Sequence, residues 1–142
     1  MAARSEIKGM RECRESLQSM SRAIQRNVGK RSLQAPAGVL ERAVKARAPV
    51  SGRASNPTRG SLRDSVKVAP ARAERGRPTV VVIAEDIAAV PNEFGTSKMK
   101  AQPFFRPAVD GAREAAGAAM AEALKVETDA AIARAAKRAG KV

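Results

Sequence analysis

Residues 61–84 read SLRDSVKVAPARAERGRPTVVVIA, and this stretch decides the fold class. Its first apolar residues alternate with polar ones as far as Pro70, with Asp64 the one exception, which predicts a half-buried strand. Residues 79–84 are β-branched or apolar throughout, which predicts a second strand, more buried than the first. The charged residues 72–77 between them predict a polar tip. The stretch therefore predicts an antiparallel β-hairpin.

Helical periodicity precedes the hairpin. Apolar residues in the first 30 positions recur at spacings of three, four or seven, which predicts an amphipathic helix that Gly29 ends or loosens. A second helix is expected to begin near Pro36 and to stop at Pro49. The apolar stripe of the first helix consists of Ile7, Met10, Leu17, Met20, Ile24 and Val28.

The sequence after the hairpin predicts an irregular connector and then one long helix. Residues 85–105 contain several breakers, with a third short strand or a helical turn expected over residues 87–94. From Arg106 the chain is rich in Ala, Glu, Lys and Leu, which favours a helix as far as Arg138. Its predicted apolar stripe consists of Val109, Ala112, Ala116, Met120, Leu124 and Ile132.

This order of elements indicates an α+β fold: two N-terminal helices, a small antiparallel sheet built on a β-hairpin, and a long C-terminal helix. A chain of 142 residues is the length of one domain, so we expect residues 1–142 to form a single domain. Its expected parts are a helical region at 1–48, a basic loop at 49–60, the hairpin at 61–84, the connector at 85–105 and the helix at 106–138.

The composition excludes several kinds of chemistry. Without any His the chain cannot form a Ser-His-Asp or Cys-His arrangement, and one Cys cannot supply a structural zinc site. We therefore predict that the protein is not an enzyme and that it has no catalytic, cofactor-binding or metal-binding residue. We interpret Cys13 as a small residue at the edge of the first apolar stripe, although nearby arginines could lower its pKa. The strongly apolar run at 80–84 is far shorter than the ~20 residues of a membrane span, so we expect a soluble, intracellular protein.

One set of acidic residues leaves a nuclease as an alternative. Glu85, Asp86 and Glu93 could hold a metal ion, with Lys98 or Lys100 nearby to stabilise charge. Their spacing matches no two-metal signature, and paired carboxylates after a strand are common where there is no catalysis. A solvated turn is therefore the favoured interpretation.

The charge distribution leaves a second alternative. The chain carries 27 Lys and Arg against 14 Asp and Glu, a net charge of +13. Residues 1–60 hold 13 basic and 4 acidic side chains, a net charge of +9, against +4 for the rest. Such a surface attracts polyanions without any motif, so a non-specific DNA-binding protein is the alternative function. The basic half has no aromatic residue for base stacking, which favours a solvated surface or an acidic protein partner.

The aromatic residues form one group. Every aromatic side chain of the chain falls between positions 94 and 105, within two residues of a Gly or Pro. We expect a packed corner that holds the hairpin against the terminal helix, with Gly95 allowing a sharp turn. Glu93 and Arg106 lie beside this corner, and at least one is expected to pair with a backbone group or with a charge of a neighbouring subunit. The aromatic residues are Phe94, Phe104 and Phe105.

Three blocks of this chain resemble the tail-completion, head-to-tail joining family of long-tailed phages, which includes the minor tail protein Z type. Each block is short, but their order and spacing are similar over residues 40–110. Two features depart from the family pattern: Ile87-Ala88 stand where Tyr-Ala is frequent, and residues 53–60 look inserted. The blocks are APVSG at 48–52 followed by SLRDS at 61–65, EFGT at 93–96, and PFFRPA at 103–108.

The resemblance implies a structural virion protein of the phage neck, or of a prophage-derived particle such as a gene transfer agent. It would complete or terminate the tail and join it to the head, as a ring of about six copies between head-closure and tail proteins. It would move from the host cytoplasm into the virion, with no cofactor, no membrane contact and at most non-specific contact with DNA. We expect the basic loop to order against an acidic neighbour. The interaction candidates are Arg53, Arg59, Glu93, Phe94, Gly95, Thr96, Phe104, Phe105 and Arg106.

Overall fold

A computed structural model describes residues 15, 18, 20–50, 61–71 and 77–139. The loop at 51–60, the hairpin tip at 72–76 and Cys13 lie outside the described residues. The α+β class, with N-terminal helices, one hairpin and a long last helix, is confirmed. The elements are α2 (Arg22–Ser32), α3 (Gln34–Arg47), α4 (Leu62–Ser65), β1 (Val66–Pro70), β2 (Val80–Ala84), α5 (Ala89–Phe94) and α6 (Phe105–Ala139).

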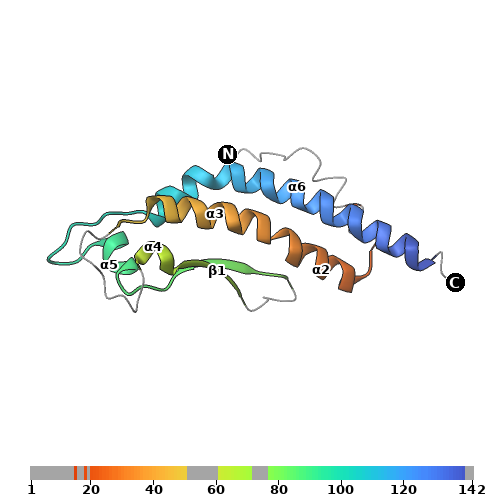
Figure 1. The fold of residues 1–142 in the computed structure, drawn as a ribbon, viewed down its shortest axis with the longest axis horizontal. Coiled ribbons are helices and arrows are strands. Elements are labelled where there is room, and N and C mark those ends of the chain that lie inside the picture. The colour runs from red at the N-terminus through yellow and green to blue at the C-terminus, as the bar shows by residue number, and fades with distance from the viewer. Residues whose placement is uncertain (1–14, 16–17, 19, 51–60, 72–76, 140–142) are drawn as a thin grey trace.

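The helix α3 lies in the middle of an elongated molecule (Figure 1). It packs against α6 on one side and against both strands of the hairpin on the other. The helices α2 and α3 follow one another along nearly one line, and α6 runs beside both in the opposite direction (Figure 1). The start of α6 therefore lies at the end of the molecule that holds α4 and α5, and the last turns of α6 lie beside α2.

Gly29 does not end the first described helix, so the expectation that the helix ends there is wrong. The helix α2 continues through Gly29 to Ser32, and α3 follows after Leu33 alone. A Cβ atom at position 29 would lie 3.0 Å from Cγ of Pro78, which precedes β2. Glycine here permits the close approach of helix and hairpin, a requirement that local sequence does not reveal. As predicted, Pro36 lies in the first turn of its helix.

The hairpin begins four residues later than the alternation predicts. The strands pair antiparallel, from Val66 opposite Ala84 to Pro70 opposite Val80. Residues 62–65, predicted as strand, form the short helix α4. Ser61 and Asp64 cause this turn by a reciprocal capping box: the Ser61 hydroxyl accepts from the Asp64 N–H at 3.4 Å, and the Asp64 carboxylate accepts from the Ser61 N–H at 3.1 Å.

The burial of the two strands is mixed, because β1 has one fully buried and two exposed residues, whereas β2 has four partly buried residues and one exposed residue. Val66 of β1 is fully buried, whereas every residue of β2 keeps some exposure. The helix α3 covers one face of this two-stranded sheet, so alternate residues of both strands point away from that face.

Buried apolar residues of the described chain form two hydrophobic clusters. The corner cluster joins α3, α4, β1 and the start of α6 through Val44, Ala48, Leu62, Val66, Phe104 and Ala108. The α2–α6 cluster consists of Val28, Leu124 and Ala131, with Met20, Ile24 and Met120 against it. The buried stripe of α6 differs from the predicted one at its end, where Thr128 and Ala131 are buried and Ile132 is half exposed. No described helix has the length and hydropathy that a membrane span requires.

Candidate interaction surface at the start of α6

Glu93 caps the long helix from a distance in sequence. The first N–H groups of a helix lack partners within it, and the side chain of Phe104, just before α6, cannot accept a hydrogen bond. The Glu93 Oε2 atom accepts from the N–H groups of Phe104 and Phe105, both at 2.9 Å, and Oε1 accepts from the N–H of Arg106 at 3.2 Å. The prediction that Glu93 or Arg106 pairs with a backbone group is confirmed. A carboxylate at this place also complements the positive end of the helix dipole.

Burial and the hydrogen bonds of the cap shift the pKa of Glu93 in opposite directions. Burial opposes ionisation and is the largest single influence, since the side chain is only 8% exposed. The three backbone N–H groups, together with the charge of Arg106, outweigh it and hold the pKa of Glu93 below its ordinary value. Glu93 is therefore a carboxylate at neutral pH, fixed in place by its partners.

Gly95 turns the chain out of α5. Its φ is +77°, in the region that favours glycine, and a Cβ there would lie 2.8 Å from the backbone nitrogen of Ala101. The loop that follows folds back on α5, because the Gln102 N–H donates to the carbonyl of Asn92 at 2.7 Å. The predicted sharp turn at Gly95 is confirmed, and it returns the chain to the start of α6. Thr96 lies exposed at the base of this loop.

The three aromatic residues divide into two kinds. Phe104 is 3% exposed in the corner cluster, and the half-buried Phe105 meets it edge to face at 6.1 Å between ring centroids. Phe94 is 61% exposed, with the guanidinium of Arg106 lying 4.9 Å from its ring centroid. The prediction that the aromatic residues pack in the corner is therefore confirmed for Phe104 and Phe105 and wrong for Phe94. The side of α5 that faces the core carries Ala89 and the cap residue, which leaves Phe94 outside.

Phe94 is part of an exposed apolar surface. Val90 is 66% exposed and lies four residues before Phe94 in α5, so these two side chains share one side of the helix. Ile87, which is 81% exposed, lies in the turn just before α5. We call these three residues the α5 patch. Val90 and Phe94 border a hollow of about 290 Å³ between β2, α5 and the start of α6. Sequence reasoning missed Ile87 and Val90, although their spacing with Phe94 was a signal. Contiguous exposed apolar surface is typical of protein interaction sites.

Each acidic residue considered for metal binding has a different partner within the chain. Glu85 pairs with Lys67 at 2.7 Å, and the Asp86 carboxylate accepts from the Ala88 N–H at 2.7 Å, while Glu93 caps α6. Among the residues that the structure describes, no group of three His, Cys, Asp or Glu side chains could hold a metal ion. Arg53 and Arg59 lie outside the described residues, so their roles in interaction stay predictions.

Comparison with known proteins identifies the family of this chain. Residues 11–95, more than half of the chain, match the family model HK97-gp10_like, described as "Bacteriophage HK97-gp10, putative tail-component". Searches of curated proteins and of solved structures gave no significant match. The matched residues include the hairpin, α5 and Glu93, so the surface described above lies largely within the family region. The chain belongs to the HK97-gp10-like family of phage tail components.

Proposed function

We propose that the protein is a structural assembly protein of the phage neck, which completes or terminates the tail and joins it to the head as a ring of copies. Membership of a tail-component family supports a structural virion role, and the three sequence blocks support the neck. The observation that carries the proposal is the α5 patch, three large apolar side chains exposed beside a rigid helix start.

The geometry around the patch suits docking. The Glu93 cap and the Gly95 turn fix α5 against α6, so a partner that covers the patch orders little of the chain. Burying a large apolar side chain contributes roughly 1.5–3 kcal/mol, so covering three of them contributes substantially to a contact. A net charge of +13 favours neighbours with acidic surfaces and speeds their encounter.

The test is complementation of particles from a strain that lacks the gene. Purified wild-type protein should restore joined heads and tails, counted by negative-stain electron microscopy. Val90→Ser should reduce joining while the thermal unfolding midpoint stays near wild type, since Val90 is exposed. Val126→Ser is the matched control, because Val126 is 59% exposed on α6, away from the α5 patch, and should join normally. Normal joining without the protein, or equal defects in both variants, would contradict the proposal.

The alternative of non-specific DNA binding makes a different prediction. Affinity for duplex DNA would then fall steeply with salt, because bound phosphates release counterions. Joining lost in Val90→Ser with unchanged DNA affinity would separate the assembly role from any contact with DNA.

A further inference from the structure

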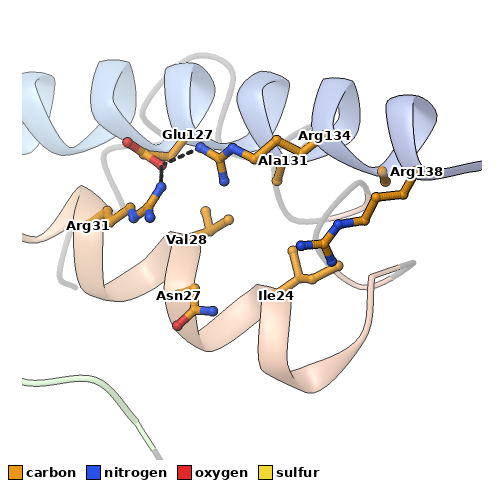
Figure 2. A pocket seen from close by; sticks show the side chains of 9 residues that line it. Ile24, Asn27, Val28, Arg31, Glu127, Ala131, Arg134 and Arg138 are labelled. Carbon is orange, nitrogen blue, oxygen red and sulfur yellow. Dashed lines mark ion pairs between the residues drawn. The ribbon is translucent and has the colours of Figure 1, made fainter. Parts of the chain in front are cut away.

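A cleft of about 340 Å³ lies between α2 and the last turns of α6, at the opposite end of the molecule from α5. Its floor is apolar, with Val28 and Ala131 buried and Ile24 beside them. Arginines from both helices surround this floor: Arg31 from α2 and Arg134 from α6 point toward Glu127 (Figure 2), and Arg138 lies further along α6. We call this the basic cleft.

The described residues neutralise the positive charge of the basic cleft only in part. Among them, one carboxylate faces three guanidinium groups, and its Oε2 atom lies 3.6 Å from Arg31 and 3.7 Å from Arg134. Both distances exceed those of a hydrogen bond, and this buried oxygen has no hydrogen-bond partner in the described part of the chain. The side chains of Arg31 and Arg134 are more than half exposed. The cleft can therefore accept a further carboxylate beside an apolar side chain.

The turn after β2 presents that combination. Glu85 and Asp86 precede Ile87, the most exposed large apolar residue among those described, and all three border one hollow. Glu85 is half exposed and pairs with the exposed Lys67, an arrangement that exchanges readily for another partner. We call residues 85–87 the acidic turn. It is a local reversal of sign on a strongly basic chain.

We propose that the acidic turn of one copy docks into the basic cleft of the next copy. Ile87 would cover the apolar floor, and the carboxylates would meet Arg134 and Arg138. Because every copy carries +13, a contact between copies needs opposite charges to meet locally, and these two surfaces supply them. The inference rests on the proposed function, since it assigns the subunit contact of the ring.

The placement of the two surfaces gives the contact its symmetry. The acidic turn lies at the end with α4 and α5, and the basic cleft lies at the end with α2 and the C-terminus of α6 (Figure 1). Two different surfaces make a head-to-tail contact, which repeats from copy to copy and closes into a ring when the rotation allows.

Charge exchange within one chain tests the contact in the particle complementation assay. The cleft variant carries Arg134→Glu and Arg138→Gln, which changes the charge by −3. The turn variant carries Glu85→Lys and Asp86→Asn, which changes it by +3 and keeps an acceptor for the Ala88 N–H. A third chain combines all four substitutions. The control carries Arg113→Glu and Arg63→Gln, a change of −3 at exposed residues outside both surfaces.

Each single-surface variant should lower joining by about tenfold or more, because like charges then face each other. The combined chain should recover to within about threefold of wild type, and the control should join normally. Unfolding midpoints near wild type would show that all four chains fold. Wild-type joining in both single-surface variants, or no recovery in the combined chain, overturns the contact alone. Failure of wild-type protein to restore joining overturns the proposed function and this contact with it.

Discussion

The helix α6 packs against α3 at one end of the molecule and against α2 at the other, and the two contacts differ in how they bury polar groups. At the corner cluster, Phe104 is buried and the Glu93 carboxylate satisfies the first N–H groups of the helix. The α2–α6 cluster has three buried residues among those described, and both Glu127 Oε2 and the Thr128 hydroxyl are buried there without a hydrogen-bond partner in the described part of the chain. The comparison teaches that the corner satisfies its buried polar groups, while the α2–α6 end leaves two buried polar atoms without a hydrogen-bond partner among the described residues.

The largest expected effect is at the corner cluster. Phe104→Ala should lower the free energy of unfolding by about 3–5 kcal/mol, because it removes a buried ring and leaves a cavity. Phe94→Ala should cost about 1 kcal/mol or less, since its exposed ring contributes mainly the contact with Arg106. Urea unfolding of both variants measures the difference. Equal losses would show that Phe94 belongs to the core.

Removing the distant cap should have the next largest effect. Glu93→Ala leaves the N–H groups of Phe104 and Phe105 without acceptors and should lower the free energy of unfolding by about 1–3 kcal/mol. Glu114→Ala, at an exposed position of the capped helix α6, serves as the control and should change the free energy of unfolding by less than about 0.5 kcal/mol.

The Glu93 cap also predicts a pH dependence. Its pKa is lower in the folded chain than in the unfolded chain, so its stabilisation is present above the ordinary glutamate pKa of about 4.3. That stabilisation is lost as the pH falls from there through the folded pKa. Glu93→Ala should therefore show a weaker loss of stability below about pH 4.3 than wild type, by urea unfolding across pH. Parallel pH profiles would refute the role of the carboxylate.

Two glycines should respond in opposite directions. Gly95→Ala should lower the free energy of unfolding by about 1–2 kcal/mol or more, because its φ is positive and Ala101 leaves no room. Gly38→Ala in α3 should raise it by up to about 1 kcal/mol, since nothing lies within 4 Å of the added Cβ. Thermal unfolding of the pair measures both signs. A destabilised Gly38→Ala would mean that α3 packs more tightly there than described.

The smallest change in the free energy of unfolding is expected beside the α2–α6 cluster. Thr128→Val replaces a buried hydroxyl that has no partner in the described chain with a methyl group of similar shape. The free energy of unfolding should rise by about 1 kcal/mol. A loss of similar size would show that the hydroxyl is satisfied in solution, and would remove one difference between the two ends.

Local patterns predicted much of this fold. The alternation before Pro70 and the apolar run at 80–84 predicted the hairpin, and the blocks around Glu93 and Phe104 indicated a phage tail family. The start of β1 was predictable too, because Ser61 and Asp64 have the spacing of a capping box. The alternation of residues 62–68 by itself indicates a strand that starts four residues earlier.

The remaining features depend on contacts between distant residues. The role of Gly29 depends on Pro78, 49 positions later, and the cap by Glu93 joins residues 11–13 positions apart. The exposure of Phe94 depends on which side of α5 meets the core. The buried stripe of α6 includes Ala131 rather than Ile132, a shift of one position that the apolar pattern alone does not reveal. The clustering of the aromatic residues in the sequence predicted the packed corner, but it did not predict that Ile87 and Val90 are exposed.

Hydrogen exchange of the native protein tests the central contrast between the two ends most directly. The amide protons of Phe104, Phe105 and Arg106 bond to Glu93, and they should exchange only in openings that approach global unfolding. Amides of α2 from Gln25 to Val28 should exchange through cheaper local openings, because a small cluster and half-exposed ion pairs hold that helix. Slower exchange in α2 than at residues 104–106 would contradict a fixed corner and a weakly held α2–α6 end.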